Sequence, residues 1–255
     1  MQDFTLEAYE YYLKAIKSNY ENIFRVKDYF LLDRSVSSFV LLRHDVDRKP
    51  KNAIKMAYLE NQMGVRSTYY FRARPHVFKP KIILEIAALG HEIGYHYESL
   101  ADKNGDQKAA LKDFEENLAR FRELTPVETI AMHGSPLKQY DNRDMWCTPE
   151  SESYLRGYLD ILGEVYLHID CSDIAYINDT GRNWSYNKHN RRDVVRSLLS
   201  PSFKDYYELL ACLEKKFYKK IFFQVHPERW ADNDVEYYIQ WVKDFTINTI
   251  KRVVK

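Results

Sequence analysis

The feature that most constrains the fold is a repeated alternation of strand-like and helix-like segments. Apolar runs rich in β-formers alternate at least four times with segments whose apolar residues recur at helical spacing. This alternation implies parallel strands joined by helical crossovers. No repeat, low-complexity segment or Pro/Gly-rich linker divides the 255 residues. We therefore expect an α/β fold with a single barrel-like domain over residues 1–255.

The expected elements can be placed by residue number. The expected strands are 38–46, 67–72, 91–96, 128–133, 162–168, 173–178 and 221–226, and the expected helices are 5–20, 51–63, 80–89, 106–124, 203–217 and 233–253. Residues 134–150 and 179–192 are expected to be polar loops. Acids and histidines gather where the strands end, and α/β barrels assemble their sites at that edge. Carboxylates and imidazoles together are typical of a Zn, Fe, Co or Mn site.

Composition excludes several classes of protein. Lys and Arg number 38 against 37 Asp and Glu, so global charge gives no support for nucleic-acid binding. The three cysteines are scattered, without a Cys-x-x-Cys pair, which argues against a disulfide scaffold and for a reducing compartment. The first residues lack the pattern of a signal peptide, and no run approaches a membrane span. We expect a soluble, cytoplasmic protein.

The first acidic motif supplies a candidate metal ligand and a candidate base. Asp45 and Asp47 lie two residues apart, so on a strand they share a face, and Arg43 shares it too. Like charges this close raise one pKa unless a cation or metal intervenes. An exposed acidic strand end, or a helix cap at Asp47, is the alternative.

Histidines supply the other candidates. His91 and His96 are five residues apart, so on a strand they face opposite ways, and we expect His96 to be the ligand and His91 to be structural. His133 ends a strand before a Gly-Ser-Pro turn and is a further ligand candidate, although a lone histidine there is often structural. His226 also ends a strand, and an imidazole with a pKa near 6.5 suits proton transfer to a leaving amine. A strand-end histidine bonded to backbone is the alternative for His226.

Two segments combine an acid, an arginine and a tryptophan, as a sugar-binding cleft requires. The first holds Asp179, Arg182 and Trp184, and the second follows Glu228 with Arg229 and Trp230. The alternative is a loop anchored by buried tryptophan and an ion pair. The remaining histidines are expected to be structural or exposed: His44, His76, His168 and His189.

Over residues 38–230 the order of these motifs resembles that of the NodB-like polysaccharide deacetylases (carbohydrate esterase family 4), in an atypical bacterial branch. The resemblance implies a distorted (β/α) barrel and metal-dependent removal of acetyl groups from sugars. It implies Asp45 as base, Asp47 and His96 as metal ligands, Asp179 near a tryptophan, and His226 as the leaving-group acid. The family's second ligand histidine falls on Leu100 here, so we predict that His133, or alternatively Glu98, replaces it.

The resemblance further implies one divalent ion, zinc first, with cobalt, manganese, nickel or iron as alternatives. The expected partner is an acetamido sugar, such as a nucleotide sugar or an intermediate of surface-polysaccharide synthesis. We expect Arg43, Arg182, Trp184, Arg229 and Trp230 to bind substrate and Asp179 to orient His226. Two other functions stay open: hydrolysis of a small non-sugar amide, and sugar binding by an inactive family member.

Overall fold

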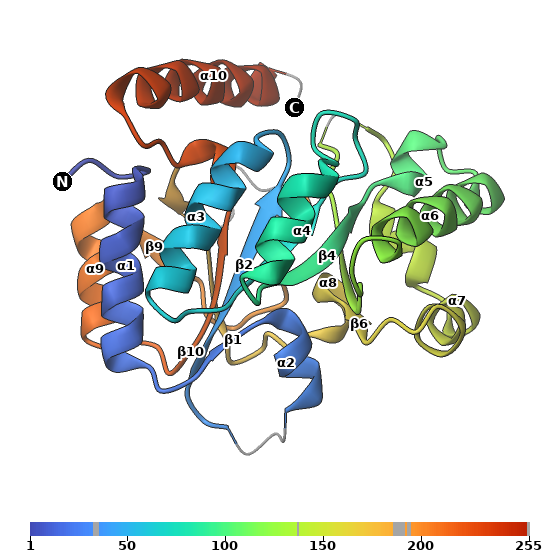
Figure 1. The fold of residues 1–255 in the computed structure, drawn as a ribbon, viewed down its shortest axis with the longest axis horizontal. Helices are drawn as coiled ribbons and strands as arrows, with labels where there is room; N and C mark the ends of the chain where they lie inside the picture. The colour runs from blue at the N-terminus through green and yellow to red at the C-terminus, as the bar shows by residue number, and fades with distance from the viewer. Residues whose placement is uncertain (33–35, 137, 186–191, 193–194, 254–255) are drawn as a thin grey trace.

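The computed structural model describes residues 1–32, 36–136, 138–185, 192 and 195–253. In this part of the chain a sheet of parallel strands curls into a half-barrel that helices cover from outside (Figure 1). The strands run in the order β6-β5-β4-β3-β2-β10-β7, and the short β1 also pairs with β2. The strands are β1 (Ile23–Phe24), β2 (Phe39–Val46), β3 (Thr68–Phe71), β4 (Glu92–Tyr97), β5 (Thr129–Met132), β6 (Gly163–Glu164), β7 (Ala175–Asn178) and β10 (Lys220–Val225). The prediction of an α/β fold with a distorted, parallel-stranded barrel is confirmed.

The helices lie where the helical spacing predicted them, with ends shifted by a few residues. The longer ones are α1 (Leu6–Asn19), α3 (Pro50–Gln62), α4 (Pro80–Ala88), α6 (Gln107–Arg122), α9 (Tyr206–Glu214) and α10 (Asp234–Val253). Short helices are α2 (Val26–Leu31), α5 (Ser99–Asp102), η1 (Asn142–Trp146), α7 (Pro149–Ser153), η2 (Tyr154–Tyr158), α8 (Val165–His168) and η3 (Pro227–Arg229). A separate small ladder joins β8 (Trp184–Ser185) to β9 (Ser202–Phe203). No helix in the described ranges is both long and apolar enough to span a bilayer.

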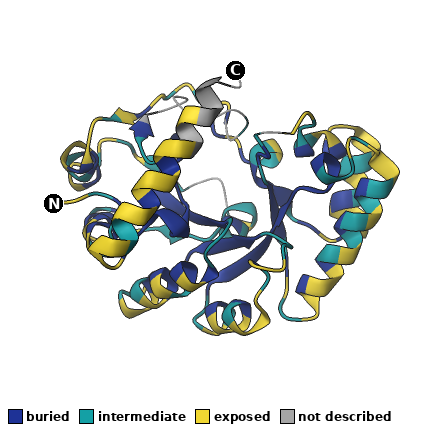
Figure 2. Cartoon of the chain, turned by 90° about the horizontal axis from the view of Figure 1, so that it is seen from above, coloured by how far each residue is buried: buried dark blue, intermediate teal, exposed yellow. Residues whose placement is uncertain are grey.

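Alternate residues of each strand serve two different cores. The outward side chains, such as Val40, Leu42 and Phe223, pack against α1, α3 and α9. The inward side chains, such as Leu41 and Phe222, fill the floor of the barrel. The inward row of β2 continues through Arg43 to Asp45 and then to Asp47, as the period of two predicts. Figure 2 shows the buried strands enclosed by helices that are exposed on their outer sides.

The barrel wall is open at one seam. Within the described residues no ladder joins β6 to β7, the two ends of the sheet. Val165, Ile169, Cys171 and Ile174 pack into the inner core across this seam instead. The expected strand 162–168 is therefore correct only at Gly163 and Glu164, and it is wrong from Val165 on, where α8 begins.

A helix N-cap explains the wrong strand. The Glu164 carboxylate accepts hydrogen bonds from the backbone N–H groups of Tyr166 (2.7 Å) and Leu167 (2.9 Å), which begins α8. Asp205 caps α9 in the same way, so that helix begins later than its apolar spacing suggested. The expected loop 134–150 contains the short helix η1, and much of the expected loop 179–192, including His189, lies outside the described residues.

Candidate metal and acid–base site

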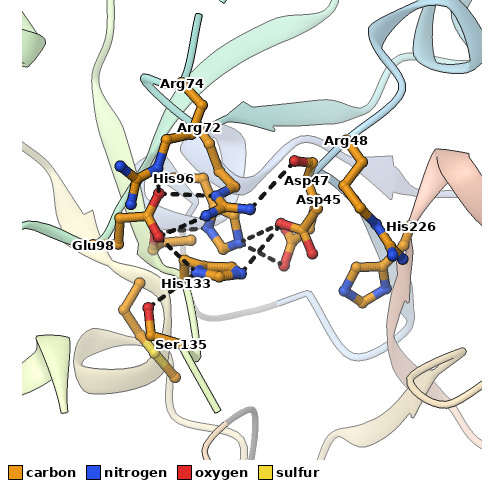
Figure 3. Close-up of polar contacts among 12 residues, drawn as sticks. Asp45, Asp47, Arg48, Arg72, Arg74, His96, Glu98, His133, Ser135 and His226 are labelled. Carbon is orange, nitrogen blue, oxygen red and sulfur yellow. Dashed lines mark hydrogen bonds and ion pairs between the residues drawn. The ribbon is translucent and has the colours of Figure 1, made fainter. Parts of the chain in front are cut away.

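Three side chains from three strand ends converge at the mouth of the barrel (Figure 3). Asp47 follows β2, His96 lies near the end of β4, and His133 follows β5. Nε2 of His96 lies 3.5 Å from Oδ1 of Asp47, and Nε2 of His133 lies 3.7 Å from the same oxygen. The convergence follows from the topology, because parallel strands bring their carboxyl ends to one edge of the sheet.

Hydrogen bonds orient both imidazoles toward Asp47. Nδ1 of His96 lies 2.9 Å from the carbonyl oxygen of Ala131, and Nδ1 of His133 lies 3.1 Å from Oε2 of Glu98. Both partners only accept hydrogen bonds, so each Nδ1 carries the proton and each Nε2 keeps its lone pair. Burial lowers the pKa of His96, which favours the neutral ring. Metal-ligating histidines are held in this same way.

Asp47 supplies a buried acceptor without a partner. Its Oδ1 is shielded from solvent and has no hydrogen-bond partner among the described residues. Burial alone would raise the pKa of Asp47, but the neighbouring imidazoles outweigh it and hold this pKa below its ordinary value. An ionised oxygen left without a donor is costly unless a cation lies beside it.

The donor set fits a divalent ion, although it is not drawn together into a metal-bound arrangement. In the described part of the chain no group of three or more His, Cys, Asp or Glu side chains forms a preformed cluster. Ligands ~2 Å from a tetrahedral ion lie ~3.3 Å from one another. The separations of 3.5 and 3.7 Å therefore exceed that value by only a few tenths of an ångström.

Glu98 is already engaged, which favours His133 as the third ligand. Its carboxylate accepts two hydrogen bonds from Arg72, at 2.9 and 2.7 Å, and one of 2.6 Å from Arg74. Burial would raise the pKa of Glu98, but His133 and the arginines outweigh it and lower this pKa. Leu100 is 2% exposed and packs into the outer core, away from the mouth.

Asp45 lies beside His96, and hydrogen bonds from Arg43 and Gln224 hold its carboxylate. Nε and Nη2 of Arg43 each donate a 2.7 Å hydrogen bond to its carboxylate, and Nε2 of Gln224 donates one of 2.6 Å. Its Oδ2 is 3.6 Å from Nε2 of His96. Burial would raise the pKa of Asp45, but the Arg43 charge outweighs it and lowers this pKa. The expectation that Arg43 contacts substrate is contradicted, because Arg43 is completely buried and its guanidinium is committed to Asp45.

His226 forms a second buried group on the far side of the aspartates in Figure 3. Its Nδ1 lies 2.6 Å from Oδ1 of Asp179, and its backbone N–H donates to Oδ2 at 2.9 Å. Nη1 of Arg229 donates to the same Oδ1 at 2.7 Å, and the Trp230 indole N–H donates to Oδ2 at 2.9 Å. Burial and Arg229 disfavour protonation of His226, but Asp179 outweighs them, so the pKa of His226 is raised. Burial would raise the pKa of Asp179, but Arg229 and His226 lower it to about 2.

The two acid–arginine–tryptophan segments are buried anchors rather than sugar contacts. Trp230 is 1% exposed and Arg229 is 7% exposed, and both bind Asp179. Trp184 stacks on Phe4 with ring centroids 5.3 Å apart and is 3% exposed. The expectation that Arg229, Trp184 and Trp230 bind substrate is therefore contradicted.

Arg182 is also committed to the interior, which contradicts its expected contact with substrate. Its guanidinium lies 4.9 Å from the Phe4 ring centroid and donates a 3.0 Å hydrogen bond to the carbonyl of Arg229. Its side chain is only 6% exposed.

Sequence reasoning missed Gln224, Arg72 and Arg74. Gln224 faces Arg43 across the β10–β2 ladder, and that register is not readable from the sequence. Arg72 and Arg74 directly follow β3, which ends at Phe71, so their position after a strand could have marked them as site residues. His91 was expected to be structural, and it lies on the outer face of the sheet with Nε2 3.1 Å from the carbonyl oxygen of Ala57.

No protein-family model matches the chain, and no curated protein matches it. Similar solved structures include a Streptococcus mutans CE4 esterase, with 12% identity, 91% of this chain and 87% of that chain covered, and a TM-score of 0.48. A CE4 family pseudoenzyme from Bacillus anthracis has 11% identity, 86% of this chain covered and a TM-score of 0.48, and this chain spans 63% of its length. The peptidoglycan deacetylase PdaC from Bacillus subtilis has 12% identity, 88% and 100% of the two chains covered, and a TM-score of 0.39. These structures come from the family that the motif order resembles. At identities of 11–12%, the roles of single residues rest on the geometry of this chain.

Proposed function

We propose that the protein is a metal-dependent hydrolase that removes the acetyl group from an acetamido sugar. The observation that carries this proposal is the buried, unpartnered Oδ1 of Asp47, faced by Nε2 of His96 and Nε2 of His133. Asp47, His96 and His133 would hold one divalent ion, with zinc first among the candidates. Such an ion supplies Lewis-acid polarisation of a carbonyl oxygen.

In this proposal Asp45 takes a proton from the attacking water. Arg43 and Gln224 occupy three of the acceptor positions of its carboxylate, which leaves capacity for one further donor. The low pKa of Asp45 keeps the carboxylate ionised at neutral pH. The two hydrogen-bonding partners fix its direction, so the base is oriented before substrate arrives.

In this proposal His226 gives a proton to the departing amine. Asp179 holds Nδ1 and leaves Nε2 for the leaving group. Because the pKa of His226 is raised, more of the ring is protonated near neutral pH than in an isolated imidazole. Asp179 acts through His226 and is a positioning residue. Arg229 and Trp230 in turn hold the Asp179 carboxylate.

The sugar part of the proposal rests on the order of the motifs. A cytoplasmic acetamido sugar, such as a nucleotide sugar or an intermediate of surface-polysaccharide synthesis, is the proposed substrate. A panel of acetamido sugars and small non-sugar amides, read as released acetate, tests this choice. If acetate is released only from the non-sugar amides, the protein is instead a hydrolase of small non-sugar amides.

Elemental analysis of purified variants tests the ligand set. His133→Ala should lose most of the bound metal, because one of three ligands is removed, whereas Glu98→Gln should retain more of it. Metal loss in Glu98→Gln but not in His133→Ala would show that the third ligand was wrongly chosen.

Asp45→Asn tests the base. It should abolish acetate release and leave the metal bound, because the three proposed ligands are untouched. Full activity in Asp45→Asn would overturn the mechanism. A wild-type protein that binds metal and sugar but releases no acetate would instead be an inactive sugar-binding member.

A further inference from the structure

The C-terminal helix α10 carries its polar residues inward. Gln240 is 1% exposed and Asp244 is 5% exposed. Asp244 lies 3.8 Å from Arg48 and 3.7 Å from Arg182, and Glu236 lies 3.2 Å from Lys49. Ion pairs and hydrogen bonds, rather than an apolar stripe, therefore hold much of α10 against the barrel.

Tyr237 packs inward against the outer core, whereas the other apolar side chains described on α10 face outward. Their exposed fractions are Val235 71%, Tyr238 62%, Ile239 50%, Trp241 48%, Val242 55% and Phe245 61%. They recur at spacings of three and four, so they form one stripe along the helix, and Trp241 stacks on Phe245 with ring centroids 5.7 Å apart. Figure 2 shows this helix lying across one end of the barrel with its outer side exposed. A helix of a soluble protein places such a stripe against the core, so this one is built to be covered by something else.

A basic cavity lies at the same end of the barrel. It has a volume of about 670 Å³ and lies between the first turns of α3 and α4. Both helices begin with the sequence Lys-Pro-Lys, at 49–51 and at 79–81. Its cationic lining residues are Arg48, Lys49, Lys51, Lys79 and Lys81, joined by His76, and no Asp or Glu lines it. Of these, Lys51, Lys79 and Lys81 have no carboxylate partner among the described residues.

The stripe and the cavity belong to one surface. Lys49 pairs with Glu236, and Lys55 pairs with Asp232, so the start of α10 is fastened to the first turns of α3. Figure 1 shows α10 above the end at which α3 begins, and the cavity joins that end of α3 to the start of α4. An apolar, aromatic stripe therefore lies on the same surface as Lys51, Lys79 and Lys81, whereas Arg48 and Lys49 are paired with acids.

We propose that this surface docks on an anionic lipid membrane. The apolar side chains of α10 would enter the boundary between headgroups and acyl chains, and the lysines of the cavity would meet lipid phosphates. Trp and Tyr are enriched at that depth of a bilayer. A second copy of the chain is a poorer occupant, since a two-fold interface would bring two basic cavities together and repel. The proposal concerns where the protein works and does not depend on the acetyl-removing activity.

Co-sedimentation with vesicles tests the proposal on the full-length protein. We expect binding to vesicles of mixed phosphatidylglycerol and phosphatidylcholine, and at least tenfold weaker binding to phosphatidylcholine alone. Trp241→Glu with Phe245→Glu should lower binding to the mixed vesicles at least tenfold. Lys51→Glu with Lys81→Glu should do the same and should remove the dependence on anionic lipid.

A matched variant and a second measurement separate the outcomes. Phe217→Glu removes a side chain that is 72% exposed elsewhere on the surface, so it should bind vesicles as the wild type does. Circular dichroism melting of each variant should match the wild type, because every altered side chain is at the surface. Equal losses in Phe217→Glu, or no binding by the wild type, would overturn the proposal. So would a wild-type dimer that ignores vesicles and that Trp241→Glu converts to a monomer.

Discussion

Glu60 of α3 is a buried carboxylate whose loss should destabilise the protein by an amount that the structure allows us to work out. It accepts hydrogen bonds from Tyr9, from Ser67 at 2.6 Å and from Tyr69 at 2.8 Å, and its Oε1 lies 2.6 Å from Nε2 of His44. Burial alone would raise the pKa of Glu60. The effect of His44 and the other partners is larger, so the pKa of Glu60 is lowered from 4.5 to about 2. At 1.36 kcal/mol per pKa unit, this depression corresponds to about 3 kcal/mol of stability at pH 7.

Glu60→Gln should therefore lower the free energy of unfolding by about 3 kcal/mol at pH 7. The glutamine side chain has one acceptor oxygen in place of two, so it can accept only part of the hydrogen bonds that the carboxylate accepts. Its NH₂ group would stand where hydroxyl groups now donate to a carboxylate oxygen. For a chain of this size the loss is equivalent to a fall in melting temperature of about 6–12 °C.

The pH dependence has a definite sign. A depressed carboxylate pKa stabilises the fold above the unfolded value and loses that contribution as pH falls through the folded value. The difference between wild type and Glu60→Gln should therefore shrink to roughly 1 kcal/mol at pH 3. Thermal melts of both proteins at pH 7 and pH 3, followed by circular dichroism, measure this difference in stability.

Glu85→Gln, at an exposed position of α4, is the control and should change stability by less than about 0.5 kcal/mol. A Glu60→Gln melting temperature within about 2 °C of wild type at pH 7, or an equal shift at both pH values, would refute the reasoning.

Three other predictions concern the site and its support. Leu100→His should not raise metal occupancy in elemental analysis, and it should cost about 2–5 kcal/mol in denaturant unfolding, because position 100 lies in the core. Gly94→Ala should cost about 1–3 kcal/mol in the same assay, because the added methyl would overlap the buried Tyr70 ring. In a thiol titration of the native protein, Cys147 should react first, because it is exposed, whereas burial raises the pKa of Cys171 to about 12 and should delay its reaction until unfolding.

Local patterns were enough to predict the convergence of the site. Asp45, Asp47, His96 and His133 each follow or end a buried strand, and parallel strands must bring those ends together. The period of two separated His96 from His91 correctly, since they lie on opposite faces of the sheet.

Contacts between distant segments could not be predicted in this way. Trp184 is buried because Phe4, from the other end of the chain, stacks on it. Arg43 binds Asp45 rather than substrate because Gln224 and the barrel floor close around it. An arginine and a tryptophan beside an acid have the same local sequence whether they line a cleft or anchor a loop. Only the packing of remote residues decides between the two.

The seam between β6 and β7 has a consequence for how the barrel opens. Elsewhere along the barrel wall, backbone hydrogen bonds link neighbouring strands, so an amide there exchanges its proton only when a ladder is broken. Within the described residues no strand ladder closes the wall at the seam, and side chains that include Val165, Ile169, Cys171 and Ile174 pack across it. Separating side chains breaks fewer bonds than separating strands, so local opening should begin there. In hydrogen–deuterium exchange, residues 165–174 should take up deuterium well before β2, which is paired on both of its edges.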